Sequence, residues 1–170
     1  MVNLIVVGAL TWFHVFSVIG WTGAALTFLV TIKPTLAKFS PVASGEFVVK
    51  MLPRFVRSVQ VLSILTIIFG PSLAFAMADG PPNAFDLKSP WSICIVIGAS
   101  IGITAFLVVF LVLTPTAKKL TTLIRQMQQN PQKPPSAELP RLQKRLAIIP
   151  PLAVSLLLAT EVFMVAAAQF

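Results

Sequence analysis

Four side chains in the long apolar segments of this sequence could take part in chemistry: His14, Cys94, Glu161 and Met164. His14 is the only histidine and Cys94 is the only cysteine. Imidazole, carboxylate, thiol and thioether groups are all metal ligands, and the sulfur groups suit copper in particular. We therefore treat these four residues as candidate metal ligands. A further interpretation is that His14 and Met164 are the two axial ligands of a haem iron.

The depth of two of these residues predicts that they meet. His14 lies about 15 Å along a helix that starts at Leu4, and Glu161 lies about 13 Å before the chain end at Phe170. If the first and last helices are neighbours, the two residues fall at nearly the same height. A carboxylate in hydrocarbon is costly without a partner. We therefore expect a hydrogen bond between His14 and Glu161.

Several roles for this polar pair stay open. The alternatives are a buried contact that fixes the helix register, a metal or haem site, and a group that relays protons or contacts lipid. One histidine supplies only one imidazole, so a bis-histidine haem is excluded within the chain. One cysteine excludes an internal disulfide and any multi-cysteine metal site. HExxH, P-loop, GxGxxG and CxxC motifs are all missing from the sequence, and the spans lack the polar ladder of a pore.

The composition indicates an integral membrane protein. Of the 170 residues, 56% are hydrophobic and 11% are charged, whereas a soluble domain has about 25% charged residues. The net charge of +8 would suggest nucleic-acid binding in a soluble chain. Here the basic residues gather where membrane helices end, so we expect no nucleic-acid partner. The N-terminus lacks the basic start and the short apolar run of a cleavable signal peptide.

The apolar segments predict the fold class. Crossing a bilayer takes about 20 apolar residues. Four segments meet this length, and they cover approximately residues 4–32, 59–77, 91–113 and 146–170. We predict an all-α polytopic membrane protein, a four-transmembrane-helix antiparallel bundle formed by one domain over residues 1–170.

The charges predict the orientation in the membrane. Apart from Lys88, every basic residue lies in the first connection, residues 33–58, or the third, residues 114–145. The positive-inside rule places these connections in the cytoplasm and both termini outside the cell membrane. Basic side chains at the membrane surface reach the phosphates of the lipid bilayer. The residues expected to do so are Arg54, Arg57, Lys118 and Lys119.

Helix two starts before the membrane, and helices three and four continue beyond it as a cytoplasmic hairpin over about residues 114–145. Leucine, isoleucine and methionine at helical spacing extend the third helix to about Gln129, and Ser136 can cap a returning helix. This hairpin is structural or docks a soluble partner. Prolines mark other ends: Lys33-Pro34 should end the first helix. The second span should end with Gly70-Pro71 and the tail of small residues from Ser72 to Met77. Pro150-Pro151 should bend or restart the fourth helix.

A GxxxG pattern occurs in the third span. Gly98 and Gly102 lie on one helix face and let another helix approach closely. We expect tight packing at this face, and it is a candidate contact with partner membrane subunits.

The first helix resembles that of a known superfamily. The opening helix of the CopD-like (copper-resistance D) membrane proteins is similar in its pattern of a histidine followed by a tryptophan and a glycine. In this sequence the pattern consists of His14, Trp21 after six further residues, and Gly23 after one more, followed by Lys33-Pro34. In the second span, the Arg54-Phe-Val-Arg57 segment and Gly70 are also similar. The resemblance covers roughly residues 1–75.

The resemblance implies a function that involves copper or haem. In a CopD-like protein, His14 with Glu161 or Met164 would handle copper in the outer half of the bundle. A four-helix branch of the superfamily includes the HemJ-like protoporphyrinogen oxidases, which implies haem b with His14, Trp21 and Met164 as contacts. The alternative is a non-catalytic accessory subunit of a larger membrane oxidase or monooxygenase. We rank copper handling first, the accessory subunit second and the HemJ-like enzyme third.

Overall fold

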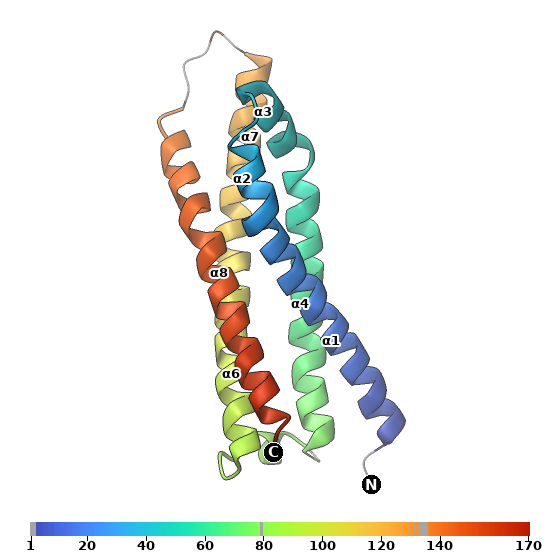
Figure 1. The fold of residues 1–170 in the computed structure, drawn as a ribbon. Coiled ribbons are helices and arrows are strands. Elements are labelled where there is room, and N and C mark those ends of the chain that lie inside the picture. Colours follow the sequence, from blue (N-terminus) through green and yellow to red (C-terminus); the bar gives the residue numbers. More distant parts are fainter. Residues whose placement is uncertain (1–2, 79, 131, 133–135) are drawn as a thin grey trace.

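The computed structural model describes residues 3–78, 80–130, 132 and 136–170, and this part of the chain is helical without strands (Figure 1). Two of the elements, η1 and η2, are π-helical turns within longer helices. The elements in chain order are α1 (Leu4–Thr27), η1 (Phe28–Ile32), α2 (Lys33–Leu36), α3 (Pro41–Lys50), α4 (Leu52–Met77), α5 (Pro81–Ala84), α6 (Pro90–Leu107), η2 (Val108–Leu113), α7 (Thr114–Gln129) and α8 (Leu139–Ala167).

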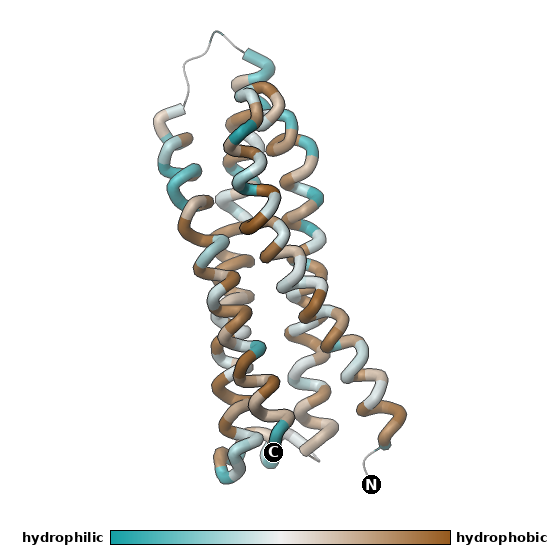
Figure 2. Tube along the Cα trace, in the orientation of Figure 1, coloured by the Kyte–Doolittle hydropathy of each residue, from teal (hydrophilic) through white to brown (hydrophobic). Residues whose placement is uncertain are grey.

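Among the described residues, four continuous helical runs are long and apolar enough to cross a membrane. They are Leu4–Leu36, Leu52–Met77, Pro90–Gln129 and Leu139–Ala167. The predicted four-span all-α membrane bundle is therefore confirmed. Figure 2 shows the polar residues gathered at one end, beyond the apolar middle of the bundle. We call this the basic end, and the opposite end, where both termini lie, the termini end (Figure 1).

The long helices form two hairpins. α1 packs along α4 and α6 packs along α8, whereas contacts between these two pairs are fewer (Figure 1). Stacked phenylalanines fix the register of the first hairpin: the ring centroids of Phe13 and Phe69 are 5.0 Å apart, and those of Phe28 and Phe55 are 5.1 Å apart. The core lies where the hairpins meet. Its buried residues are Trp21, Val59, Ala105, Val109, Ala153 and Leu157.

Both π-helical turns end two residues before a proline. The backbone N–H of Lys33, which precedes Pro34, donates to the Phe28 carbonyl, and that of Thr114, which precedes Pro115, donates to Val109. A wider turn shifts the carbonyl that the proline ring would otherwise meet, so the helix can continue. The prediction that Lys33-Pro34 ends the first helix is therefore wrong, because helical structure continues to Leu36.

Two other helices also continue through prolines. α4 passes Gly70-Pro71 and ends at Met77, which confirms residue 77 as the predicted end of the second span. α8 runs through Pro150 and Pro151 without restarting. Membrane helices tolerate proline where other groups satisfy the freed backbone carbonyls.

One such freed carbonyl has a visible partner. Pro151 has no N–H for the carbonyl of Ala147, one helical turn earlier. Lys33 Nζ donates to this carbonyl over 3.1 Å. A lysine of the first hairpin thus satisfies the backbone of α8 and links the two hairpins at the basic end.

The basic end is built largely as predicted. α7 ends at Gln129, as expected from its apolar spacing. α3 begins at Pro41, with Ser40 Oγ accepting from the Ala43 backbone N–H at 3.3 Å. Ser136 is not the cap of α8, because α8 begins at Leu139 and Ser136 Oγ accepts from the backbone N–H of Glu138 instead.

Candidate functional site

His14 packs against α4. Its ring covers Gly70, where a Cβ atom would lie 2.9 Å from His14 Cε1, so a larger residue at position 70 would force the imidazole to shift. His14 Nδ1 is buried and makes no hydrogen bond to any residue that the structure describes. The backbone carbonyl of Thr66, one turn before Gly70, lies beside the ring but outside hydrogen-bond geometry with Nδ1. A polar nitrogen without a partner in an apolar surrounding is costly, so this ring is a candidate for ligand contact.

Glu161 has a partner on α1, and the partner is Thr22. Thr22 Oγ1 donates to Glu161 Oε1 over 2.5 Å. Thr22 lies eight residues beyond His14, about 12 Å further along the helix. Among the described residues no hydrogen bond joins His14 to Glu161, so the predicted pair does not form. The depth count assumed that α1 and α8 run side by side from their ends, but α1 leans away from α8 at the termini end (Figure 1).

The two sulfur residues belong to the second hairpin. Met164 Cε lies 3.0 Å from the position that a Cβ atom at Gly98 would take, and Cys94 precedes Gly98 by one turn of α6. His14, in contrast, packs within the first hairpin. In the described ranges of the chain, no three His, Cys, Asp or Glu residues gather in a group that could hold a metal ion. The arrangement therefore brings Glu161 to α1 but leaves the other candidate ligands on separate hairpins.

The glycine face of α6 is covered by α8. Gly98 and Gly102 are buried, and Thr160 and Phe163 of α8 lie within 3.3 Å of the positions that their Cβ atoms would take. The prediction of tight packing is confirmed, but the partner is α8 of the same chain. The proposed use of this face for partner subunits is therefore wrong.

Trp21 lies at the centre of the bundle. Its side chain is only 2% exposed and packs with core residues from α4, α6, η2 and α8. The indole Nε1 has no hydrogen-bond partner. A buried tryptophan N–H usually finds an acceptor, so this donor is a second unsatisfied group on α1.

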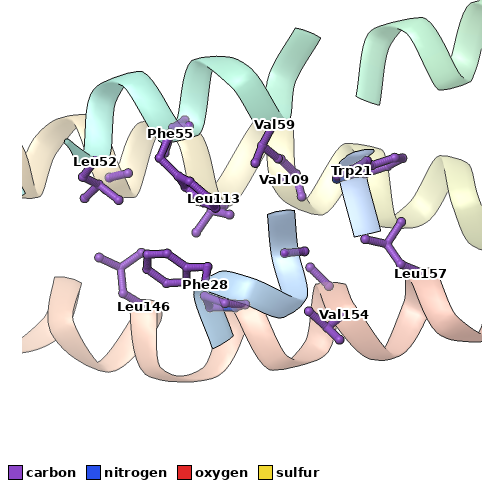
Figure 3. A pocket seen from close by; sticks show the side chains of 15 residues that line it. Trp21, Phe28, Leu52, Phe55, Val59, Val109, Leu113, Leu146, Val154 and Leu157 are labelled. Carbon is purple, nitrogen blue, oxygen red and sulfur yellow. The ribbon is translucent and has the colours of Figure 1, made fainter. Parts of the chain in front are cut away.

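An apolar cavity of about 40 Å³ lies between the two hairpins, from Trp21 toward the basic end (Figure 3). Sequence reasoning did not identify it, although small residues such as Ala25, Ala117 and Ala153 occupy positions where helices pack. All of its lining residues except Trp21 have purely apolar side chains. The lining residues are Trp21, Ala25, Phe28, Leu52, Phe55, Val56, Val59, Val109, Leu113, Ala117, Leu146, Pro150, Ala153, Val154 and Leu157.

The basic residues expected at lipid phosphates are exposed. Arg54 donates to the Lys50 carbonyl over 2.5 Å, and Lys119 pairs with Glu138 over 2.8 Å. Arg57 and Lys118 lie near the start of α4 and of α7. These positions at the basic end are compatible with phosphate contact, which stays a prediction.

No family model matches this chain, and no curated protein or solved structure matches it either. A functional conclusion therefore depends on the residues and the geometry described above, together with the resemblance of the first helix.

Proposed function

We propose that this integral membrane protein binds a metal through the imidazole of His14, as haem iron in the first place and as a copper ion in the second. The supporting observation is the half-buried His14 ring over Gly70, whose buried Nδ1 has no hydrogen-bond partner among the described residues. A histidine that serves only packing usually hydrogen-bonds through its buried nitrogens. A metal-binding histidine typically donates its second ring N–H to a carbonyl or carboxylate.

The surroundings of His14 fit the role of a single ligand. The Thr66 carbonyl lies beside the ring and can accept a hydrogen bond from Nδ1–H after a small ring movement, which would leave Nε2 as the ligating nitrogen. One protein imidazole is sufficient to hold haem iron. Haem, when bound, supplies one-electron chemistry, and the chain's own part is to orient the imidazole through Gly70 and Thr66.

The candidate copper set fits less well. Glu161 is held by Thr22, and the sulfur atoms of Cys94 and Met164 lie in the other hairpin. Because His14 packs within the first hairpin, a copper centre that used all four residues would need the hairpins to move. Copper stays the second candidate because the two sulfur residues lie near the same glycine, Gly98.

The orientation is part of the proposal. The cations of the basic end favour the cytoplasmic side, which places both termini outside and His14 in the outer half of a cell membrane. A non-catalytic accessory subunit uses the same bundle and requires no metal at His14. Metal binding therefore separates these two functions.

Absorption spectra and metal analysis of the purified protein test the proposal. We expect a Soret band after expression with added haem, lost in His14→Ala and weakened in Gly70→Ala, where the new Cβ would press on the ring. Gly23→Ala is the matched control, since nothing lies within 4 Å of the position of its Cβ. If the purified protein contains copper but no haem, and the copper is lost in His14→Ala, then the bound metal is copper. No Soret band, with equal copper in wild type and His14→Ala, would refute both.

A further inference from the structure

The start of α8 carries three cations on one helix face. Arg141, Lys144 and Arg145 are spaced by three and four residues, which places their side chains next to one another. All three are exposed. The acidic residue before them, Glu138, pairs with Lys119 over 2.8 Å, and none of the three forms an ion pair with a residue that the structure describes. Their charges are therefore free for an anion from outside the chain.

These cations lie at the depth of the lipid headgroups. Residues 146–167 of α8 contain no lysine or arginine and extend over about 33 Å. Because the hydrocarbon core of a bilayer is about 30 Å thick, Arg145 lies at its boundary. Arg141 is about 6 Å further along the helix, still within the headgroup layer of roughly 5 to 8 Å on each side.

The same face of α8 continues into the membrane as an exposed apolar surface. Ile148 and Leu152 follow Lys144 at intervals of four residues, and they are 57% and 49% exposed. Figure 2 shows this change from hydrophilic residues at the start of α8 to apolar residues further along. A phospholipid has the same order of groups, with an anionic phosphate above an acyl chain.

Lys33 brings a fourth cation from the other hairpin. Its Nζ donates to the Ala147 carbonyl over 3.1 Å, and Ala147 follows Lys144 by three residues on the adjoining side of α8. This bond uses one of the three donors of the ammonium group. The cluster thus combines charges from both hairpins where they meet at the basic end.

We infer that Arg141, Lys144 and Arg145, with Lys33 at their edge, bind the headgroup of a phospholipid that carries two negative charges. A headgroup with one charge would leave most of these cations uncompensated, and a zwitterionic headgroup has no net charge to offer. Basic sites of membrane helices at this level bind lipids with several phosphate charges. The site lies on a different helix from the cations expected at lipid phosphates, which belong to α4 and α7, and it does not depend on the metal proposed at His14.

Native mass spectrometry of the full chain in a neutral detergent tests the inference. The probes are tetraoleoyl cardiolipin, dioleoyl phosphatidylglycerol and dioleoyl phosphatidylcholine, which carry two, one and no net negative charges. We expect cardiolipin to bind about fivefold to tenfold more tightly than phosphatidylglycerol, and phosphatidylcholine to bind most weakly. Inorganic pyrophosphate at an equal concentration should not displace cardiolipin, because it has no acyl chain to cover Ile148 and Leu152.

Two triple variants locate the site. Replacing Arg141, Lys144 and Arg145 with glutamine should weaken cardiolipin binding at least about tenfold, since each basic residue near an anionic surface contributes about fivefold. The matched control replaces Lys38, Lys50 and Arg125 with glutamine, which removes the same charge from the basic end. Its effect should stay below about threefold, because Lys50 is paired with Glu46 and Arg125 lies about 16 Å beyond Thr114 along α7.

If the first triple variant does not fold, Lys144→Gln alone decides, with an expected loss of about threefold to fivefold and a loss below about twofold counting against the site. Equal losses in the two triple variants would show that net charge alone attracts the lipid. That result, or equal affinity for cardiolipin and phosphatidylcholine, would overturn the inference. Displacement of cardiolipin by pyrophosphate would overturn the assignment to a lipid and favour a free phosphate compound.

Discussion

Replacing Thr22 with valine should weaken the association of the two hairpins. Thr22 is 94% buried and its hydroxyl donates to Glu161 Oε1 over 2.5 Å, and Glu161 is the only acidic residue of α8. Valine keeps the shape of the side chain but removes the donor. The carboxyl group would then stay in an apolar surrounding without its partner on α1.

The size of the effect follows from measured hydrogen bonds between membrane helices. These contribute about 0.6 kcal/mol on average and at most about 1.7 kcal/mol. The short distance and the burial of Thr22 place this bond in the upper part of the range, at about 1 to 1.7 kcal/mol. The unfolding equilibrium constant should therefore rise about fivefold to fifteenfold in Thr22→Val.

Unfolding by SDS titration in mixed micelles measures this difference. A double-mutant cycle with Glu161→Met isolates the pair, and its coupling energy should equal most of the loss in Thr22→Val. Thr11→Val is the matched control, because the Thr11 hydroxyl donates only to the Val7 carbonyl of its own helix. A Thr22→Val effect no larger than that of Thr11→Val, or a coupling energy below about 0.3 kcal/mol, would refute the reasoning.

Three further predictions concern other contacts. Lys33→Met should lower the free energy of unfolding by about 1 kcal/mol in the same titration, because it leaves the Ala147 carbonyl unpaired, whereas Lys38→Met should not. Gly98→Ala should lower the melting temperature, since its Cβ would lie 3.2 Å from that of Phe163, while Gly23→Ala should not. Glu46 accepts a hydrogen bond from Lys50, which together with the lysine charge lowers the pKa of Glu46. The contribution of this pair to α3 is present above the ordinary pKa of glutamate and is lost as pH falls through the lowered value. Carbon NMR titration should show the Glu46 pKa return to its ordinary value in Lys50→Met, and an unchanged pKa would contradict this.

Local features of the sequence were sufficient to predict the four spans. The length of each apolar run predicted four membrane-crossing helices, which the structure confirms. The end of α7 at Gln129 also follows from local apolar spacing. Each of these signals acts within one or two helical turns, so no knowledge of tertiary packing was required.

The prolines were misinterpreted because their effect depends on how the preceding turn and the neighbouring hairpin accommodate them. Pro34 is accommodated by a π-helical turn, and the carbonyl freed by Pro151 is satisfied by Lys33 from the other hairpin. Neither arrangement leaves a mark in the residues next to the proline. A proline rule that holds for isolated helices therefore does not determine where a helix ends in this bundle.

The site was only partly predictable for a related reason. Sequence reasoning selected the ionisable residues correctly as unusual, but the count of residues from the helix ends placed Glu161 level with His14 and not with Thr22. Such a count ignores helix tilt, and α1 follows α4 away from α8. The cavity beside Trp21 arises only when four helices pack together, so no single segment predicts it.

The pattern of satisfied and unsatisfied polar atoms argues that α1 is the functional helix. Within the described part of the chain, the buried side-chain nitrogens and oxygens have hydrogen-bond partners except His14 Nδ1 and Trp21 Nε1. Even the hydroxyls of Ser17 and Ser63 bond to backbone carbonyls of their own helices. The two exceptions are seven residues apart, two turns along one face of α1. A fold that satisfies its other buried groups has no structural reason to leave these two free, and the proposed function gives His14 a partner from outside the chain.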